Sequence, residues 1–420
     1  MGAVLRAGII GLGGFAGHHH ATLARLEAQG GWRVVCGCDP QPGAFTELAG
    51  RLDFAGRGVR LFDDYLTMLD TCRDELDVVT IPTPIPLHAP MHAACVARGL
   101  PVYLEKPPTL SWRELEAMIA VEQGARRTTQ VGFNHIVDPQ RQATKARLLG
   151  GEFGAPRRVT VFGLWARPAS YYRRASWAGR LLLDGRLVLD SPLGNAMAHL
   201  AHDALLWGGH NDVLSWGEPE AVRAELYRAH EIEGADTVFL VARLAGGVEL
   251  ALAMSHAMPS GTRHAETVEA EHACLRYVVG REQTLTVRWT DGHEVVTTDS
   301  PFESGCSFVE GNFAAYGAYL RGAVERPLTR LVDCRPFVAL NNLAYLAAGR
   351  IATVPDRHLA RDAAADTVGI VGLPEAVERF LATSELPSAQ GLAWAAPGGS
   401  ATRADLERVE ACVGELVGAT

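Results

Sequence analysis

Lysine is nearly absent from this sequence. Only two of its 39 lysine and arginine residues are lysines, and one of them, Lys106, lies in the stretch "VYLEKPPTL" (102–110). Arginine keeps its proton in proteins, whereas a lysine removed from water can release and take up a proton near neutral pH. Lys106 is therefore either an ordinary surface residue or a position that requires an amine, and its context has to decide.

Other absences narrow the class of protein. The sequence has no Lys/Arg-rich run and a formal net charge of −9, which argues against nucleic acid as a partner. No apolar run approaches the ~20 residues that span a bilayer, and the N-terminus has no secretory leader, so we expect a cytoplasmic protein without membrane association. The eight cysteines include no C-x-x-C pair and no zinc-ligand spacing. We therefore expect no metal site, and reduced core thiols at Cys36 and Cys38.

Residues 1–133 alternate strand patterns with helix patterns. Mostly apolar, β-branched runs alternate with amphipathic stretches, which is typical of a parallel sheet covered on both faces. We predict an α/β fold class with an N-terminal Rossmann domain, a doubly wound parallel sheet. The predicted strands are 4–10, 32–38, 59–62, 77–83, 101–105 and 128–133, and the predicted helices are 18–29, 43–52, 63–71, 88–99 and 111–124.

The pattern changes after about residue 153, and we predict a second domain over residues 134–355. Short Gly-containing turns between strand patterns indicate hairpins, so we expect an α+β domain with an open, mainly antiparallel sheet. The predicted strands are 156–166, 220–229, 236–257 and 272–298, and the predicted helices are 195–207, 309–324 and 334–350. Residues 356–420 form a partly helical C-terminal extension, with helices at 374–382 and 402–417 and "PSAQGLAWAAPGGS" (387–400) between them as a mobile strap.

A glycine-rich turn follows the first predicted strand. In "GIIGLGGFAGHHHATL" (8–23), a G-x-G-x-x-A pattern lies between strand and helix. Its first glycine permits a tight turn, its second lets the backbone approach a pyrophosphate, and the helix N-terminus supplies N–H donors. In this context we predict a dinucleotide site rather than a merely structural turn. The expected cofactor contacts in the loop are Gly11, Gly13, Gly14, Phe15 and Ala16.

Asp39, at the end of the second strand, decides between NAD and NADP. Its carboxylate suits the adenosine ribose hydroxyls and repels a 2′-phosphate, and the following residues 40–42 supply no arginine to neutralise one. We expect NAD, with NADP less favoured. The three consecutive histidines at 18–20 point in three directions on a helix and cannot share one metal ion, so we interpret them as helix surface and core.

Several motifs in order along the chain resemble the Gfo/Idh/MocA oxidoreductases, the family of glucose-fructose oxidoreductase and inositol dehydrogenase. The motifs are "GLGGFAGHHH" (11–20), "CDP" (38–40), "TPIPLH" (83–88), "YLEKPPT" (103–109), "VGFNHIVDP" (131–139), "GEFGAPRRV" (151–159) and "NAMAHLAHD" (195–203). The resemblance covers about residues 4–355. It implies a Rossmann domain followed by a domain whose open sheet carries the substrate and often forms oligomer contacts. Since an uncovered apolar face invites pairing, we expect a homodimer or homotetramer through this sheet.

The resemblance also answers the question of Lys106. The family's E-K-P motif matches Glu105, Lys106 and Pro107, and its lysine takes part in acid/base chemistry at the reacting hydroxyl. Lys106 lies at the carboxyl end of a predicted parallel strand, where doubly wound sheets bind ligands. A cofactor and apolar walls at that edge would lower the pKa of its amine and allow reversible proton transfer.

The family has an aspartate four residues before a histidine on a helix, and both reach the substrate. Here the pattern matches Asn195 and His199, and the spacing predicts that both lie on one helical face. Asparagine carries no charge, which leaves open whether His199 or Lys106 is the main base. A core histidine is the alternative for His199. Asp190 is a candidate for the missing carboxylate, and His202 and Asp203 are expected to support His199.

Further contacts follow from strand ends and from one loop. Thr83, Pro84 and His88 follow the fourth strand and are expected in the cofactor cleft, and the resemblance implies cofactor or substrate contacts for Asn134 and His135. The loop 169–192 combines aromatic rings, which stack on sugars, with arginines, which bind carboxylates. The substrate-binding candidates are Lys106, Asn134, Tyr172, Arg174, Trp177, Asn195 and His199; for the aromatic and arginine positions, interface or core packing is an equal alternative.

We therefore predict an oxidoreductase that moves a hydride between NAD and a secondary alcohol of a sugar, cyclitol or related polyol. Two alternatives remain at this point. One is an NAD-dependent glycosidase that works through transient oxidation, and the other is a non-catalytic regulatory protein that senses NAD or a sugar.

Overall fold

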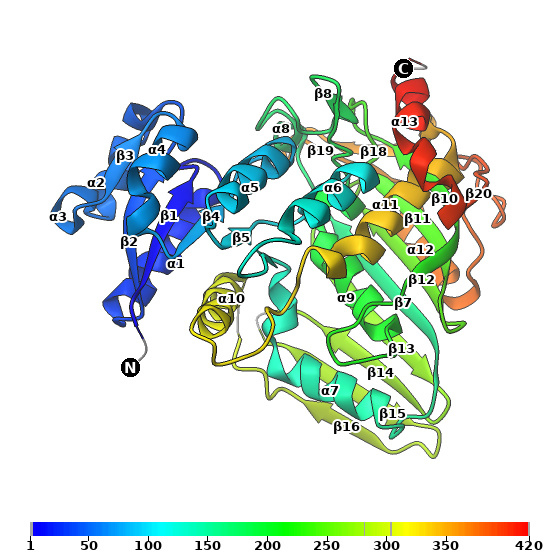
Figure 1. Ribbon diagram of the computed structural model, residues 1–420. Coiled ribbons are helices and arrows are strands. Elements are labelled where there is room, and N and C mark those ends of the chain that lie inside the picture. Colours follow the sequence, from blue (N-terminus) through cyan, green and yellow to red (C-terminus); the bar gives the residue numbers. More distant parts are fainter. Residues whose placement is uncertain (1–2, 281, 303–304, 419–420) are drawn as a thin grey trace. The chain divides into compact units, whose positions relative to one another are not determined.

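The computed structural model describes residues 3–280, 282–302 and 305–418. The chain forms two compact units (Figure 1). The first comprises Met1–Thr109, Glu114–Asp138 and Ser304–Cys334, and the second comprises Leu110–Arg113, Pro139–Glu303 and Arg335–Thr420. Among the described residues, no helix is both long enough and apolar enough to cross a bilayer.

The first unit is built on a six-stranded parallel sheet with the order β3-β2-β1-β4-β5-β6. The strands run outward from β1 in both directions, so the sheet is doubly wound and the predicted Rossmann fold is confirmed. Cys36 and Cys38 are buried and free in its second strand, as predicted. The strands are β1 (Leu5–Ile10), β2 (Trp32–Cys38), β3 (Arg60–Phe62), β4 (Val78–Ile81), β5 (Val102–Leu104) and β6 (Gln130–Val131). The helices are α1 (Ala16–Ala28), α2 (Thr46–Arg51), α3 (Phe54–Arg57), α4 (Tyr65–Cys72), α5 (His88–Ala97) and most of α6 (Trp112–Glu122).

Helix α10 (Gly305–Leu320) belongs to the core of the first unit. The ring of Phe313 stacks on that of Tyr103, with centroids 4.2 Å apart. At Gly317 an added Cβ would lie 3.1 Å from Trp32, so a small residue lets the helix approach. Sequence analysis groups this helix with residues 134–355, because periodicity indicates that a helix forms and not which core it joins.

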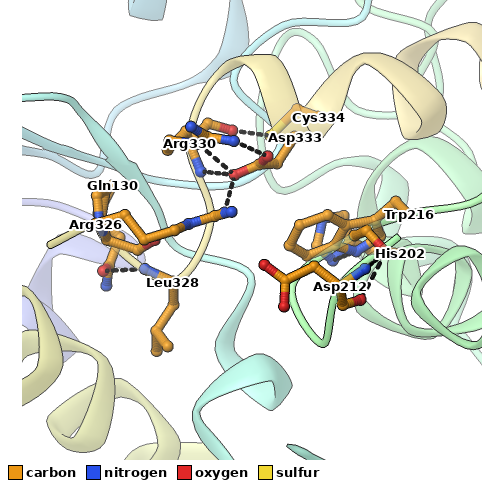
Figure 2. Close-up of polar contacts among 11 residues, drawn as sticks. Gln130, His202, Asp212, Trp216, Arg326, Leu328, Arg330, Asp333 and Cys334 are labelled. Atoms are coloured by element: carbon orange, nitrogen blue, oxygen red, sulfur yellow. Dashed lines mark hydrogen bonds and ion pairs between the residues drawn. The ribbon is translucent and has the colours of Figure 1, made fainter. Parts of the chain in front are cut away.

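One carboxylate organises the segment that follows α10. Asp333 accepts hydrogen bonds from the Arg326 side chain at 2.6 Å and from the backbone and side chain of Arg330 at 2.7 and 2.9 Å (Figure 2). The backbone N–H of Leu328 donates to Oε1 of Gln130 in β6 at 3.3 Å. The charge-assisted bonds to Asp333 hold the segment together, and the hydrogen bond between Leu328 and Gln130 joins it to the sheet.

The second unit contains a ten-stranded sheet, whose main path has the order β16-β15-β14-β13-β7-β12-β11-β10-β17. Most neighbours are antiparallel, which confirms the predicted mainly antiparallel sheet, while β7–β12 and β10–β17 are parallel. The strands are β7 (Pro156–Trp165), β10 (Pro219–Arg228), β11 (Thr237–Leu244), β12 (Glu249–Ser255), β13 (Thr262–Ala270), β14 (Ala273–Val278), β15 (Thr284–Trp289), β16 (Glu294–Thr297) and β17 (Ile351–Thr353). Strand β13 escapes the sequence pattern because a charged residue, Glu266, is buried in it beside Ala265.

Helices cover one face of this sheet. On β7, Gly163 faces Met197 and Leu200, where its missing side chain leaves room for α9. Its neighbour Leu164 points to the other face and packs with residues of the C-terminal extension. The helices are α7 (Pro139–Leu149), α8 (Ala169–Tyr172), α9 (Ala198–Gly208) and α11 (Arg335–Ala348), and a small hairpin joins β8 (Leu182–Leu183) to β9 (Arg186–Leu187).

The C-terminal extension is packed along its length. It contains the hairpin β18 (Leu359–Asp362) and β19 (Thr367–Ile370), helix α12 (Leu373–Thr383), strand β20 (Ser400–Thr402) and helix α13 (Val409–Gly418). The connector predicted as a mobile strap carries Trp394, which is 5% exposed within an apolar cluster. That prediction is wrong because Trp394 packs in this apolar cluster and holds the connector in place. The Pro/Gly/Ser content of the connector does not indicate such packing.

Candidate functional site

The glycine turn after β1 has the geometry of an anion cradle. Gly11 has a φ of +116°, which favours glycine, and its N–H donates to the Cys38 carbonyl at 2.7 Å. Gly14 has a φ of +57° with open space around its Cα. Helix α1 begins at Ala16 and has no acidic residue in its first turn, so its N-terminus attracts an anion without competition from within that turn.

Asp39 lies beside this turn at the end of β2. Its Oδ2 accepts a hydrogen bond from the Leu12 N–H at 3.3 Å, and its Oδ1 accepts one from the Gln41 N–H at 3.0 Å. The carboxylate is half-buried. Backbone donors thus hold a negative charge next to the glycine turn, in the position where a Rossmann domain meets a ribose.

Glu105 follows β5 and is held from two sides. Its Oε1 lies 2.8 Å from Nε2 of His19, and its Oε2 accepts the backbone N–H of Lys106 at 3.1 Å. His19 is fully buried in α1, and its Nδ1 lies 2.6 Å from the Thr80 hydroxyl. With Glu105 ionised, His19 donates from Nε2 and Thr80 donates to Nδ1. The pair ties the helix after the glycine turn to the backbone of Lys106.

The other two histidines of the triplet have separate surroundings. His20 is buried, its Nε2 lies 3.1 Å from the Gly11 carbonyl oxygen, and burial lowers its pKa to about 4. His18 is exposed. The prediction that the triplet divides between helix surface and core is confirmed, although sequence analysis did not identify His19 as the partner of Glu105. The position of His19 shortly after the glycine turn is the one sequence feature that indicates this role.

His88 braces two loops at the carboxyl edge of the parallel sheet. Its Nε2 lies 2.8 Å from the Thr83 carbonyl oxygen and its Nδ1 lies 3.0 Å from that of Pro107. The side chain is buried, and burial lowers its pKa. Thr83 is half-buried and Pro84 is exposed on the same loop. A neutral His88 has one N–H and can donate to only one of these carbonyls, so it is hydrogen-bonded to one loop and packs against the other.

Asn134 and His135 lie in a single 3₁₀ turn after β6. The Asn134 carbonyl oxygen accepts a hydrogen bond from Asn312 Nδ2 of α10 at 2.8 Å. The His135 ring lies against Phe308, with centroids 5.1 Å apart. Helix α10 thus fixes the backbone of this turn.

In the second unit, Asn195 and Asp190 are hydrogen-bonded. Asn195 Nδ2 donates to Asp190 Oδ1 at 2.9 Å, and the Gly179 N–H donates to Asp190 Oδ2 at 2.7 Å. Arg174 approaches the same carboxylate at 3.6 Å. Asp190 is 3% exposed, so a buried carboxylate group lies directly beside Asn195.

The four-residue spacing predicts that Asn195 and His199 lie on one continuous α-helix, and this prediction is wrong. Asn195 is in a π-helical turn, Pro192–Ala196, and α9 begins only at Ala198. Ser191 caps the turn by accepting the Gly194 N–H at 2.9 Å, and Pro192 starts it. The proline and its cap set a separate first turn, which the spacing alone does not reveal.

The loop before this turn forms an aromatic and cationic cluster. The Arg174 guanidinium lies 3.7 Å from the ring centroid of Tyr171 and 4.6 Å from that of Trp177. Tyr172 turns elsewhere: its hydroxyl lies 3.0 Å from His256 Nδ1, and burial raises its pKa. The predicted trio is therefore divided, with Arg174 and Trp177 stacked together and Tyr172 packed against His256.

A buried ionic network behind α9 was missed by sequence analysis. Arg141 of α7 binds both oxygens of Glu266 at 2.6 and 3.0 Å and lies 3.5 Å from Asp203. Trp207 Nε1 also donates to Glu266 at 2.6 Å. Burial disfavours the charge on Arg141, but Asp203 and Glu266 outweigh it and raise its pKa. The network fixes α9 through Asp203, one turn after His199.

The second lysine of the chain lies beside this network. Lys145 is fully buried, and its amine donates to the backbone carbonyls of Trp207 and Gly209 at the end of α9. Burial lowers its pKa to about 7. On the same helix, His202 Nδ1 accepts the indole N–H of Trp216 at 3.2 Å (Figure 2). Asp203 and His202 thus anchor α9. These contacts explain why both residues are buried there, without any role at the substrate.

Comparison with known proteins agrees with the fold. Residues 5–133 match the family model described as "Oxidoreductase family, NAD-binding Rossmann fold", that of Gfo/Idh/MocA. Inositol 2-dehydrogenase 4 of Saccharopolyspora erythraea is 34% identical over 156 residues, which are 36% of this chain and 43% of the relative. The scyllo-inositol 2-dehydrogenase (NAD+) of Bacillus subtilis is 30% identical over 154 residues, 36% of this chain and 42% of the relative. The chain thus aligns with less than half the length of these curated relatives.

A solved structure extends the likeness beyond the Rossmann domain. An oxidoreductase from Agrobacterium radiobacter, in complex with NAD+, L-tartaric acid and magnesium, has a TM-score of 0.65 and 19% identity. The match covers 82% of this chain and 96% of that chain, and it shows a shared fold. The Gfo/Idh/MocA family model thus covers the Rossmann domain at residues 5–133, and the chain as a whole shares its fold with this oxidoreductase.

Proposed function

We propose that this protein is an NAD-dependent oxidoreductase that moves a hydride between the nicotinamide and a secondary alcohol of a cyclitol, sugar or related polyol. The family match and the inositol dehydrogenases among its relatives support the reaction class. The observation that carries the proposal is that the glycine turn and the E-K-P motif lie at the same edge of the parallel sheet. They follow β1 and β5, and both strands are parallel neighbours of β4, so their carboxyl ends meet at one edge.

The residues at this edge fit a dinucleotide. The open space at Gly14 and the N-terminus of α1 suit a pyrophosphate, and the Asp39 carboxylate suits ribose hydroxyls. The bound cofactor would supply the redox chemistry by accepting or donating the hydride. The proposed cofactor contacts are Gly11, Gly13, Gly14, Phe15, Ala16, Asp39, Thr83, Pro84, His88, Glu105, Lys106 and Asn134.

We propose that Lys106 exchanges the proton of the reacting hydroxyl. An arginine could not do so, because it keeps its proton, and the Glu105 contacts hold the Lys106 backbone at the strand end. On the second unit, we propose that Asn195 and His199 bind substrate hydroxyls. Asp190 would supply the negative charge that Asn195 lacks, through the 2.9 Å hydrogen bond between them.

Substrate contacts from the aromatic loop complete the proposal. Arg174 and Trp177 present a stacked cation and ring, a surface suited to a polyol or sugar face. Tyr172 is proposed as a support for this loop through His256. The protein is proposed to act on small molecules in the cytoplasm.

The test is a survey of substrates with purified protein. NAD binding would be measured by calorimetry, and NADH formation would be followed with a panel of inositols, aldoses and polyols. The proposal predicts NADH formation with at least one cyclitol or sugar. NAD binding without NADH formation from any member of a broad panel would contradict it.

A further inference from the structure

One face of the second unit's sheet is apolar across its centre. The strands β7, β12, β11 and β10 contribute side chains that alternate toward this face, and all are nearly inaccessible to solvent. They include Leu164, Tyr227, Phe239, Val241, Ala251 and Ala253. This is the face that sequence analysis expects to be open and to pair with a second subunit.

The chain covers this face with its own C-terminal extension. Phe380 and Leu373 of α12 are 0% exposed, and Val377 is 2% exposed. The Phe380 ring meets Phe239 edge to face, with centroids 5.2 Å apart, and Trp394 meets Tyr227 in the same way at 5.1 Å. The expectation of an uncovered apolar face is therefore wrong for this part of the sheet, because residues far along the chain return to it.

The extension also donates hydrogen bonds to a buried polar side chain on this face. Glu225 of β10 is 2% exposed, and its carboxylate accepts hydrogen bonds from the backbone N–H of Ser388 at 3.1 Å and from the Ser388 hydroxyl. The Tyr227 hydroxyl also donates to it at 2.5 Å. A buried carboxylate is costly unless it is paired, so a second copy of the chain docked here would have to replace the donors of Ser388.

The end of α12 is anchored to the sheet by an arginine. Arg158 of β7 donates to the Leu381 carbonyl at 2.6 Å and to the Ser384 hydroxyl at 2.8 Å. Ser384 in turn donates to Glu249 of β12 at 2.6 Å. Side chains of two sheet strands thus satisfy the helix C-terminus, which needs such partners when it is buried.

Backbone contacts show how closely the extension fits. At Gly369 of β19 an added Cβ would lie 2.6 Å from the Pro259 ring, and at Gly398 it would overlap the Ala224 carbonyl of β10. Strand β20 then pairs with β10, with Val222 opposite Ala401. Glycine at both close approaches allows the backbones to touch, so the extension continues the sheet and does not merely lie over it.

The rest of the same face offers a second copy little apolar surface. Pairing across β13, β14 and β15 places polar residues in register with the covered strands. These residues are Thr267, Glu269, Arg276, Thr286 and Arg288. The apolar exceptions in the same register are Ala265, which is buried, Cys274, Val278 and Val296, and only Val296, 58% exposed, is a large apolar side chain open to solvent. A stable interface buries about 800 Å² on each partner around an apolar centre, and this half of the face has no such centre among the described residues.

We infer that the C-terminal extension takes the place of a partner subunit on this sheet, and that the protein is a monomer. The inference does not depend on the proposed function, since it concerns the opposite face of the sheet from α9. It replaces the predicted homodimer or homotetramer. Its physical basis is that the apolar centre, the buried Glu225 and the β10 edge are all already matched by the same chain.

Sedimentation velocity on the full chain tests the inference. We expect a single species with the mass of one chain, 45.1 kDa, from about 1 to 100 μM protein, since mass action would populate a dimer as the concentration rises. A dimer or tetramer at any of these concentrations would overturn the inference.

A pair of variants on α12 tests whether the extension is what keeps the protein monomeric. Phe380→Asp places a charge in the apolar contact, whereas Ala382→Asp places the same charge on the exposed side of the same helix. We expect Phe380→Asp to expose the sheet face and raise the weight-average mass at least about twofold, with Ala382→Asp unchanged. If circular dichroism shows that Phe380→Asp is unfolded, Phe380→Ala replaces it in the same comparison. A folded variant whose α12 amides exchange rapidly with deuterium while its mass stays that of one chain would contradict the role of the extension.

Discussion

The side-chain amide of Asn195 donates a 2.9 Å hydrogen bond to the carboxylate of Asp190. Asparagine at this position lacks the charge that the resembling family places there, but the chain brings a buried carboxylate to the same point from five residues earlier. The Gly179 N–H donates to the same carboxylate, and the Arg174 guanidinium lies 3.6 Å from it. The structure therefore places a buried carboxylate beside Asn195, on a different side chain from the one that the resemblance implies.

Asp190→Asn tests whether that charge matters for activity. The substituted amide would turn a donor toward Asn195 or Gly179, and a lost charge-assisted hydrogen bond costs about 1.5–3 kcal/mol. We expect kcat/KM for the polyol to fall about 10–100-fold, with the Kd for NAD unchanged. The control is Asp184→Asn, an exposed position in the same loop, and equal kinetics in both variants would contradict the role of Asp190.

His19→Phe tests the support of Glu105. The buried carboxylate would lose its 2.8 Å partner, which costs about 1–3 kcal/mol for a group left unsatisfied. We expect this loss in the free energy of unfolding measured with urea. The neighbouring His18 is exposed, so His18→Phe should change stability by less than about 0.5 kcal/mol. Similar stabilities of the two variants would show that Glu105 finds its support elsewhere.

Lys145 makes a pH-dependent contribution to stability. Burial lowers its pKa in the folded protein to about 7 from 10.5, so between these values the unfolded chain binds a proton that the folded chain has lost. The penalty for burying the charge is complete below about pH 7 and disappears above about pH 10.5, so this residue makes stability rise with pH by up to about 1.4 kcal/mol per unit.

Lys145→Met isolates this contribution. Other groups titrate in the same range, but they cancel when the unfolding free energies of wild type and variant are subtracted at each pH. We expect the difference to shift in favour of the wild type as the pH rises from about 7 to 10. A difference that stays constant with pH would mean that Lys145 keeps its proton throughout.

Asp39→Asn tests the choice of cofactor. The carboxylate is held beside the glycine turn by two backbone donors, where it would repel a 2′-phosphate. Removing the charge should raise the ratio of kcat/KM for NADP to that for NAD by at least about tenfold. Asp63→Asn, on the neighbouring strand end, provides a control in which the ratio should not move. An unchanged ratio in Asp39→Asn would place cofactor selection in other residues.

The Rossmann unit was predictable from sequence because its rules are local. Each buried strand, the glycine turn and Asp39 follow from periodicity and spacing over short distances. The rest depends on contacts between distant segments. Helix α10 returns to the first unit through Phe313 and Gly317, β13 hides its pattern behind the buried Glu266, and the extension covers a sheet that its composition does not reveal.

The candidate site divides in the same way. Motifs predict Lys106, His199 and the glycines, and Asp190 is the candidate that the sequence offers for the missing carboxylate. The π-helical turn of Asn195, the support of Glu105 by His19 and the anchoring of α9 by Arg141 required coordinates. A motif fixes which residue is present, whereas its hydrogen-bond partners come from other strands and helices.

The proposed function depends on proton exchange by Lys106 during NAD-dependent oxidation of a polyol. The most direct test compares wild type, Lys106→Arg and Lys106→Met for NADH formation from the best polyol of the panel at saturating NAD. We predict that both variants still bind NAD and lose about 10²–10⁴-fold in kcat, since methionine has no proton to exchange and arginine does not release its proton. Wild-type kcat in Lys106→Arg or Lys106→Met would contradict the account.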